Sequence, residues 1–386
     1  MNRIIYISNY IDPKDFEYVF KLSNGKMQQQ NQRFHSMFVK SISDNFEVNV
    51  LPVLPINRSI IKKIIIKLRK HKSENVHYQG FLSVNIPLIK QVFDIFQVLI
   101  CFFKYKKNSI FIVDSMCYTG CIVIRFLKKI SNSKFICINT DLPFKFANSS
   151  NKDASSSLLD SVLYKSIKSF DAFVNITENI EKELATNKPV LIINGFLDID
   201  INNNISFVKH NPFRFAYAGA ISRANGIDRL IDTFKELPDY ELYLFGLVTD
   251  KGILNNITKN IHYFGNIYSK DLNNHMKEID CLINPRPSNL EYTLYSFPSK
   301  TFEYIKYRKP IISTKLKCYS NELMNHFYLL EEENIDMMKQ SIINIANNNE
   351  SELYRKVLEM NIYANSEYSI KKNANKLFNW INSFLQ

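Results

Sequence analysis

Three stretches in the second half of the chain decide the fold: FRFAYAG (213–219), YELYLFG (240–246) and IHYFG (261–265). Each is a short apolar run of the kind that forms a buried parallel strand, and each ends on glycine. Helical patterns lie between them, as at 226–236. Strands that alternate with helices in this way predict a doubly wound α/β domain with a parallel sheet.

The alternation continues in both directions from these stretches. Further strands are expected at 3–8, 46–53, 109–115, 134–140, 170–177, 279–285 and 309–315, and helices at 119–130, 157–168, 271–277 and 299–307. A polar stretch at 195–210 indicates a linker between two such series. We therefore predict two Rossmann-like domains, residues 1–197 and 198–365. A last helix follows at 366–386, with Leu377, Trp380, Ile381 and Phe384 at helical spacing.

The composition limits the classes of protein. Hydrophobic residues make up 46% of the 386 residues and only 9 are glycine, so the chain is globular and a collagen-like or Gly-rich repeat is excluded. A formal net charge of +12 favours an anionic partner, such as a nucleotide, a nucleic acid or an acidic lipid surface. The six cysteines lack the spacing of a metal site and are expected to be reduced thiols in the core of a cytoplasmic protein. The apolar run at the N-terminus is too short for a signal peptide.

Two stretches are amphipathic. IPLIKQVFDIFQVLICFF (86–103) is interrupted by polar residues on one side, which predicts a helix packed in a core and not a membrane span. RSIIKKIIIKLRKHK (58–72) carries seven Lys and Arg and no acid, with isoleucines at helical spacing. This second pattern fits a helix lying on an anionic membrane, which would make the protein peripheral on the inner face of the cell membrane. It fits a surface helix with a solvated basic side equally well.

The strand ends of the second half suit a phosphate or diphosphate. A glycine there lets backbone approach a ligand, and the N-terminus of the following helix offers free N–H groups. This arrangement is expected at Gly219, which AISRANG follows, and at PSK (298–300). The chain has neither GxGxxG nor GxxxxGK[ST], which argues against a dinucleotide dehydrogenase and a P-loop NTPase.

The segment NPRPSNLEYTLYSFPSKTFEYIKYRKP (284–310) is the most specific. Pro298 sets a turn and Ser299 is expected to cap the next helix, where Lys300 can neutralise a phosphate. Glu303 lies one turn later and can accept hydrogen bonds from ribose hydroxyls. The alternative is that Ser299 only caps the helix and Glu303 is a surface acid.

In this order, YAGAISRANGIDRLIDTFKEL, LYLFG, IHYFGNI, IDCLINPRP and YSFPSKTFEYIKYRKPII resemble the donor-binding domain of GT-B glycosyltransferases of the family 4 type, over about 150 residues. ICINTDLP and FDAFVNITENI look like the acceptor domain of enzymes that build bacterial surface polysaccharides. The resemblance implies two Rossmann-like domains facing across a cleft, with the last helix returning to the first domain. It implies a hexosyl- or N-acetylhexosaminyltransferase that moves sugar from a nucleotide sugar to a glycan or lipid-linked acceptor, in capsule, O-antigen (lipopolysaccharide) or exopolysaccharide assembly.

The resemblance also assigns site residues. Arg223, Lys300 and Glu303 are the expected catalytic residues. The donor-binding set is Gly219, Asn225, Gly226, Gly246, Gly265, Asn266, Ile267, Arg286, Tyr295, Ser296, Phe297, Pro298 and Ser299. The chain departs from the family at Tyr295, which stands where a first glutamate is usual, and at Asn225, which stands where lysine is usual. Lys300 is expected to supply the missing charge.

The expected reaction needs no metal or cofactor, because cations and a helix N-terminus stabilise the departing diphosphate. An Asp-Ile-Asp triplet at 198–200 falls in the linker and is discounted. By resemblance the product retains the anomeric configuration. The rival functions are a GT-B sugar-nucleotide epimerase and a basic nucleic-acid-binding protein, but the chain has no RRM, KH or helix-turn-helix signature, so no nucleic-acid partner is expected.

Four residues of the first half are candidates for the acceptor side. Asp114 and Asp141 follow predicted strands, although Asp141 in TDLP fits a turn cap equally well. His35 follows the long loop after the first strand, where it could face the cleft. Gly25, in the same loop, could allow close approach of a substrate.

Overall fold

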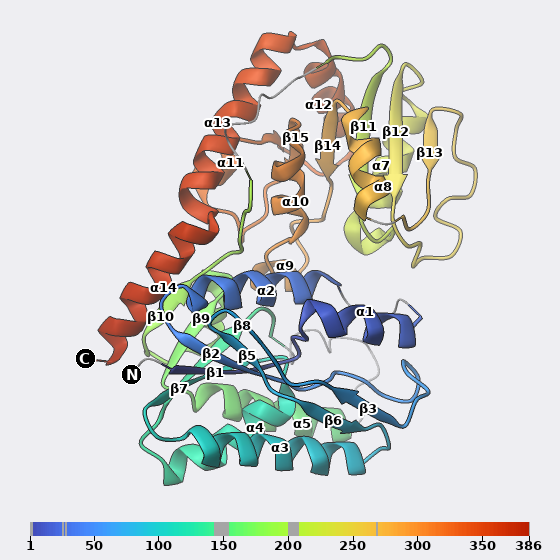
Figure 1. Ribbon diagram of the computed structural model, residues 1–386. Helices are drawn as coiled ribbons and strands as arrows, with labels where there is room; N and C mark the ends of the chain where they lie inside the picture. Colours follow the sequence, from blue (N-terminus) through green and yellow to red (C-terminus); the bar gives the residue numbers. More distant parts are fainter. Residues whose placement is uncertain are drawn as a thin grey trace. The chain divides into compact units, whose positions relative to one another are not determined.

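Two parallel sheets organise the chain in the computed structural model, which describes residues 3–24, 27, 29–142, 154–199, 208–267 and 269–385. The chain divides into a first unit, residues 1–196 with 370–386, and a second unit, residues 197–369. Each unit has its own sheet with helices packed on it (Figure 1). The structure thus has the α/β architecture predicted from the alternation of strands and helices.

The sheet of the first unit has the order β10-β9-β8-β7-β1-β2-β5-β4. Its strands are parallel except β4, which pairs antiparallel with β5. The strands are β1 (Arg3–Ser8), β2 (Glu47–Pro52), β4 (His71–Ser73), β5 (Val76–Tyr78), β7 (Ser109–Asp114), β8 (Lys134–Asn139), β9 (Ala172–Asn175) and β10 (Val190–Ile192). The helices are α1 (Pro13–Leu22), α2 (Gln29–Ser43), α3 (Ile89–Tyr105), α4 (Tyr118–Leu127), α5 (Ala154–Lys168) and α6 (Glu178–Leu184), with a 3-10 turn η1 (Lys128–Ile130).

The sheet of the second unit has the order β13-β12-β11-β14-β15-β16, and all its pairings are parallel. The strands are β11 (Phe213–Ala218), β12 (Tyr240–Phe245), β13 (Ile261–Tyr263), β14 (Cys281–Asn284), β15 (Ile311–Thr314) and β16 (Tyr328–Leu330). The other elements are η2 (Arg223–Asn225), α7 (Ile227–Lys235), α8 (Ser269–Lys277), α9 (Tyr292–Tyr295), α10 (Lys300–Tyr307), α11 (Asn321–Met324), α12 (Ile335–Asn347) and α13 (Glu350–Tyr368). The order reverses between β11 and β14, so a ligand is expected at the carboxyl ends of these two strands.

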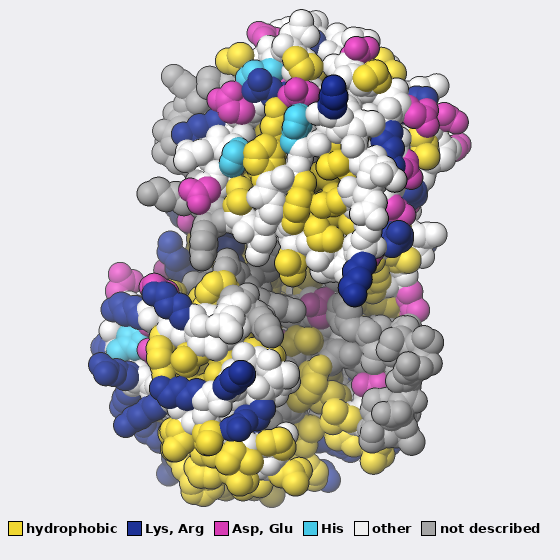
Figure 2. Space-filling view, turned by 90° about the vertical axis from the view of Figure 1, so that its right-hand side faces the viewer, with side chains coloured by type: hydrophobic (Ala, Val, Ile, Leu, Met, Phe, Trp, Pro, Cys, Tyr) yellow, Lys and Arg dark blue, Asp and Glu magenta, His cyan; other side chains and the backbone are white. Residues whose placement is uncertain are grey.

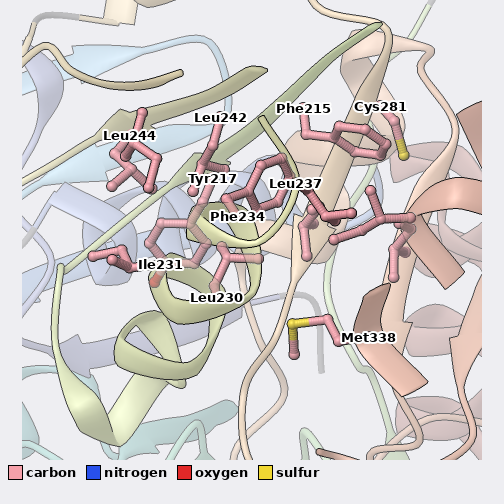
Figure 3. Close-up of a cluster of buried hydrophobic side chains, with 14 of the residues drawn as sticks. Phe215, Tyr217, Leu230, Ile231, Phe234, Leu237, Leu242, Leu244, Cys281 and Met338 are labelled. Carbon is pink, nitrogen blue, oxygen red and sulfur yellow. The ribbon is translucent and has the colours of Figure 1, made fainter. Parts of the chain in front are cut away.

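The core of the second unit lies between this sheet and helices α7 and α12 (Figure 3). Phe215 on β11 packs edge to face on Phe234 of α7, with ring centroids 5.6 Å apart. Met338 of α12 lies in the same cluster, and its sulfur accepts a hydrogen bond from Thr233 of α7. This packing fixes α7 against β11, the strand that leads to Gly219.

The last helix, α14 (Ile370–Leu385), belongs to the first unit. It packs against α2, and Leu377 and Ile381 are buried in the core cluster of that unit. Trp380 and Phe384 are partly buried against the same cluster. The helical spacing read from the sequence therefore marks the buried side of a real helix.

The stretch at 58–72 is not a helix, so its prediction as an amphipathic helix on a membrane is wrong. Residues Ile65–Leu68 form β3, which pairs antiparallel with β6 (Phe81–Val84). Ile66 and Leu68 are buried while Ile65 and Lys67 are exposed, which is the alternation of a strand. A run of β-branched isoleucines loses side-chain freedom in a helix, and pairing with β6 decides the outcome.

The helix predicted at 86–103 is confirmed as α3, but it is only partly packed in the core. Its buried side consists of Asp94, Val98, Cys101 and Phe102, while a row of large apolar side chains remains exposed. None of the helices in the described part of the chain combines the length and the apolar character that crossing a bilayer requires. The six cysteines are free and buried, as predicted.

Candidate functional site

The three glycines that end the strands of the second unit lie at neighbouring positions along one edge of the sheet. The Gly219 N–H donates to the Phe245 carbonyl at 2.7 Å, and the Gly246 N–H donates to the Gly265 carbonyl at 2.8 Å. A Cβ atom on Gly246 would lie 1.8 Å from the Gly219 carbonyl oxygen, and its φ of +138° is rare for other residues. Glycine at 246 is thus required by close approach of two backbone segments.

Lys300, at the start of α10, places its ammonium group against Gly219. Its Nζ donates to the Tyr217 hydroxyl at 2.9 Å and lies 4.4 Å from the centre of that ring. A Cβ atom on Gly219 would lie 1.1 Å from Lys300 Nζ. Glycine at 219 therefore makes room for a cation at the carboxyl end of β11, next to the backbone that follows the strand.

Burial lowers the pKa of Lys300 to about 7. The neighbouring Arg286 also lowers the pKa, whereas the Glu303 carboxylate raises it. A lysine whose charge is disfavoured in this way gains more from an arriving anion than a solvated lysine would, because the anion stabilises the charged form. The site is therefore suited to a diphosphate.

Hydrogen bonds at the first turns of α10 fix Lys300 and Glu303. The Tyr304 hydroxyl accepts from the Ala218 N–H at 3.0 Å and donates to the Ile283 carbonyl at 3.4 Å, which ties α10 to β11 and β14. Thr301 and Tyr319 are joined through their hydroxyls at 2.8 Å. Glu303 is half-buried, one turn after Lys300. A donor could thus meet a cation and a carboxylate from one rigid element.

The prediction that Ser299 caps α10 is wrong. Ser299 already has helical backbone angles, and its side chain makes no capping hydrogen bond. The Thr301 N–H donates to the Pro298 carbonyl at 2.9 Å, so the turn begins at Pro298 and Ser299 lies within it. The Ser296 hydroxyl just before this turn is buried and makes no hydrogen bond within the described residues.

Two arginines lie on connected segments of the site. Arg286 lies over the Tyr292 ring at 4.7 Å, and the Tyr292 hydroxyl donates to the Ala224 carbonyl of η2 at 3.1 Å. Arg223 is also on η2, where its backbone N–H donates to the Asp250 carboxylate at 2.6 Å and its side chain is exposed. Tyr292 thus links the segment of Arg286 to the turn of Arg223.

Asn225 and Gly226 shape this turn. The Asn225 amide donates to the Ala220 carbonyl and to the Ser222 hydroxyl, both at 3.0 Å. Gly226 has φ +75°, and a Cβ atom there would lie 2.2 Å from the Pro285 carbonyl oxygen. Asn225 therefore holds the loop together, and its neutral amide does not supply the charge of the lysine that the resemblance leads one to expect at this position.

The other predicted donor residues lie in two places. Gly265, Asn266 and Ile267 follow β13, and a Cβ atom on Gly265 would meet no atom within 4 Å, so its φ of +76° alone favours glycine. Tyr295 and Phe297 are buried before α10, and Phe297 stacks on Phe302 with ring centroids 5.2 Å apart. The structure thus brings Lys300 to Gly219, while Phe297 supports α10 through packing.

On the first unit, His35 and Asp114 come together but do not face solvent. His35 Nε2 lies 3.2 Å from Asp114 Oδ2, both side chains are fully buried, and His35 Nδ1 is hydrogen-bonded to the Tyr6 hydroxyl. The expectation that His35 faces a cleft is wrong, because α2 turns this side toward β1. Asp141 is half-buried, and its carbonyl accepts from the Ser115 hydroxyl at 3.0 Å. Gly25 lies outside the described residues.

Tyr217, Tyr292 and Tyr304 contribute to the site without having been singled out from the sequence. Residues two apart on a strand face the same side, and Tyr217 lies two residues before Gly219. This spacing was the signal in the sequence that could have identified Tyr217. No comparable signal marked Tyr292 or Tyr304, whose partners are backbone groups far away in the sequence. No group of three or more His, Cys, Asp or Glu side chains that could hold a metal ion occurs among the described residues.

Residues 198–361 match the family model described as Glycosyl transferases group 1. Solved structures with similar folds include a sucrose-phosphate synthase from Thermosynechococcus elongatus, 11% identical with a TM-score of 0.62, which covers 100% of this chain and 99% of that one. A second, described as trehalose-6-phosphate from E. coli bound with UDP-2-fluoro glucose, is 10% identical with a TM-score of 0.69 and the same coverage. A third, HepE from Anabaena in complex with UDP, is 12% identical with a TM-score of 0.57 and covers 99% of this chain and 100% of that one.

No curated protein sequence matches the chain. The identities to solved structures are low, so these likenesses establish the fold and not the substrate. The chain therefore has the GT-B α/β fold, and its match to the group 1 family model lies within the second unit.

Proposed function

We propose that the protein is a glycosyltransferase that moves a sugar from a nucleotide-sugar donor held by its second unit. The observation that carries this proposal is the Lys300 ammonium held against Gly219, at the carboxyl end of β11. The match of residues 198–361 to a glycosyltransferase family supports it, as do similar structures described with UDP and with UDP-2-fluoro glucose.

The donor diphosphate lies against the Gly219 backbone, where Lys300 neutralises it. Arg286 and Arg223 add charge from the neighbouring turn, and the start of α10 presents backbone N–H groups. Glu303 accepts hydrogen bonds from the ribose hydroxyls. As the sugar leaves, negative charge accumulates on the diphosphate, and cations already in position stabilise it without reorganisation.

The finer assignment rests on the resemblance of the second half to family 4. We infer transfer of a hexosyl or N-acetylhexosaminyl group with retention of configuration, without a metal ion or other cofactor. The acceptor is a glycan or lipid-linked glycan in the assembly of a bacterial capsule, lipopolysaccharide or exopolysaccharide. Because His35 and Asp114 are fully buried against each other, we assign them to support of the first unit's strand ends and not to acceptor binding.

The test has two stages. Thermal-shift screening with UDP-, GDP- and ADP-sugars identifies the donor, and release of nucleoside diphosphate in the presence of candidate acceptors measures transfer. Lys300→Ala and Glu303→Ala should each reduce transfer by about a hundredfold or more. Lys306→Ala is the matched control, because Lys306 is exposed on the same helix. Normal transfer by Lys300→Ala, or conversion of the donor to an epimer without acceptor, would contradict the proposal.

A further inference from the structure

Helix α3 presents an apolar side to solvent. Val92, Phe96, Ile100 and Phe103 are 64%, 59%, 51% and 52% exposed. Their spacing of four, four and three residues places them in one stripe along the helix. The buried side of the same helix includes Asp94, whose carboxylate pairs with Lys90 at 2.5 Å. The usual distribution of an amphipathic surface helix is thus partly inverted.

The stripe continues onto neighbouring elements. Helix α3 packs beside α4 and beside β6. The end of α4 and η1 add exposed Phe126 and Ile130, and the β3–β6 hairpin adds Ile65 and Leu82. We call these four residues and the four of the stripe the apolar face. In Figure 2 hydrophobic side chains gather along the lower edge of the first unit, with Lys and Arg side chains next to them. A contiguous exposed apolar surface of this kind is unusual on a monomeric protein and marks an interaction site.

The positive charge of the chain is concentrated in the same elements. Residues 48–140 contain fifteen Lys and Arg but only three acids, an excess of twelve that equals the net charge of the whole chain. Two of the three acids, Asp94 and Asp114, are buried. The exposed cations beside the apolar face include Lys67 in β3, Arg69 after it, Lys104 and Lys106 at the end of α3, and Lys129 after α4. Lys106 Nζ lies 5.1 Å from the centre of the Phe103 ring.

We propose that the apolar face docks the protein on an anionic lipid bilayer. Phenylalanine and isoleucine side chains enter the boundary between headgroups and acyl chains, and the lysines reach anionic headgroups, each contributing about 1 kcal/mol. A second copy of the chain fits this face poorly, because self-association would bring two strongly basic surfaces together. A protein interface also usually excludes lysine from its core, whereas a membrane interface accommodates it.

Docking on a bilayer through the apolar face requires neither the proposed donor site nor catalysis. The stretch at 58–72 does not lie on the membrane as the helix expected from the sequence. The residues of that stretch contribute to the same surface as a strand, through Ile65, Lys67 and Arg69.

The test is co-flotation of the full chain with vesicles of phosphatidylcholine, with or without phosphatidylglycerol. We expect binding to the anionic vesicles and a decrease at high salt. The double variant Phe96→Ser with Ile100→Ser should bind about tenfold or more weakly. The double variant Lys104→Gln with Lys106→Gln should bind the anionic vesicles more weakly, and its remaining binding should respond less to salt. Ile362→Ser is the control, because Ile362 is 57% exposed on α13 of the second unit.

Three results would overturn the proposal. The first is absence of binding to anionic vesicles at low salt, and the second is equal binding by the Phe96 and Ile100 double variant. The third is a dimer, measured by light scattering, that the double variant dissociates while neither protein binds vesicles. Unchanged circular dichroism and melting temperature establish that the variants are folded, since all four substituted side chains are exposed.

Discussion

Lys300 is the residue on which the proposed donor site depends, and burying its ammonium group has a cost in free energy. The ammonium group is buried beside the Tyr217 hydroxyl and close to Arg286, so the folded protein without ligand disfavours its charge. In the proposed function, the donor diphosphate supplies the missing counter-charge. Such a site gives up stability in the free protein in exchange for affinity for an anion.

The pH dependence of donor binding follows from the pKa of Lys300. In the folded protein this pKa is lowered to about 7, so the charged form is lost as pH rises above 7. We expect the affinity for a nucleotide sugar, whose diphosphate does not titrate in this range, to fall by up to about tenfold per pH unit above 7. Calorimetric titration from about pH 6 to about pH 9 measures it. Lys300→Arg should remove the dependence, because a guanidinium stays charged.

The stability of the unliganded protein should change with pH in the opposite direction from the donor affinity. Because the lysine pKa is lower in the folded protein than in the unfolded chain, the unfolded chain binds more protons between pH 7 and the ordinary lysine pKa of 10.5. The free energy of unfolding of the unliganded protein should rise across that range, relative to Lys300→Met. An affinity for donor that is constant with pH in the original protein would contradict this account of the site.

Substitution of two neighbouring glycines should have different effects. In Gly219→Ala the new Cβ atom collides with the flexible end of Lys300, which can move away. We expect donor affinity to fall by about tenfold or more, with a loss of stability below about 1 kcal/mol. In Gly246→Ala the collision is with the backbone of Gly219 at a positive φ, so the free energy of unfolding should fall by about 2–4 kcal/mol.

Denaturant unfolding and donor titration together measure both effects. Gly80→Ala is the control, because its Cβ atom would come no closer than 3.4 Å to another atom. An equal loss of stability in the Gly219 and Gly246 variants would show that the ammonium group is not free to move.

At the scale of elements, α10 connects the fold to the site. Tyr304 is buried, and its hydroxyl joins α10 to the ends of β11 and β14. Tyr304→Phe leaves the buried Ala218 N–H without its partner, which should cost about 1–3 kcal/mol in the free energy of unfolding. It should also weaken donor binding, because α10 carries Lys300. Tyr354→Phe on α13, where the ring is 38% exposed, should change stability by less than about 0.5 kcal/mol.

Chemical denaturation and donor titration of both tyrosine variants measure these effects. If Tyr304→Phe is as stable as the original protein, the two hydrogen bonds do not position the helix. A loss of stability with normal donor affinity would show that Tyr304 stabilises the fold but does not position Lys300 for donor binding.

The longer strands of both sheets could be predicted, because a buried parallel strand is a short apolar run whose identity is local. The three-residue strands β4, β5, β10 and β16 were not predicted, since so short a run carries no pattern of its own. RIIYIS forms β1 at residues 3–8, and the strands from 109 and from 213 begin where the sequence indicates. The hairpin of β3 and β6 could not, because isoleucines at 60, 61, 64 and 65 satisfy helical spacing as well as they satisfy a strand. What decides between them is pairing with residues 81–84, which is not local.

The site residues that a local sequence pattern marks could be predicted. Gly219 and the Lys300 turn follow from strand ends and a proline turn, and the structure brings them together. The sequence could not show that Ser299 lies inside its turn, that His35 is buried, or that Tyr304 anchors α10. The burial of His35 and the role of Tyr304 depend on contacts between distant segments, such as that of Tyr304 with Ala218. The place of Ser299 depends on the local hydrogen bond between Thr301 and Pro298, because a serine before a helix fits a cap and the first turn equally well.

At the scale of the whole molecule, the path of the chain connects two separate cores. The last helix, α14, follows the whole second unit in the sequence but packs in the first. Ile381 is fully buried there in a cluster with residues of β1 and α2. The second unit has its own cluster around Phe215 and Phe234. Each unit thus has a core large enough to unfold as a cooperative unit.

Calorimetry should therefore show two unfolding transitions with different responses. A nucleotide sugar should raise only the transition of the second unit, because a ligand stabilises the part that binds it. Ile381→Ala should destabilise the first unit by about 2–5 kcal/mol, which lowers only the other transition. Phe378→Ala on the same helix, where the side chain is 36% exposed, should lower it less. If the donor and Ile381→Ala shift the same transition, the two cores unfold together. In that case α14 couples the two cores in addition to packing in the core of the first unit.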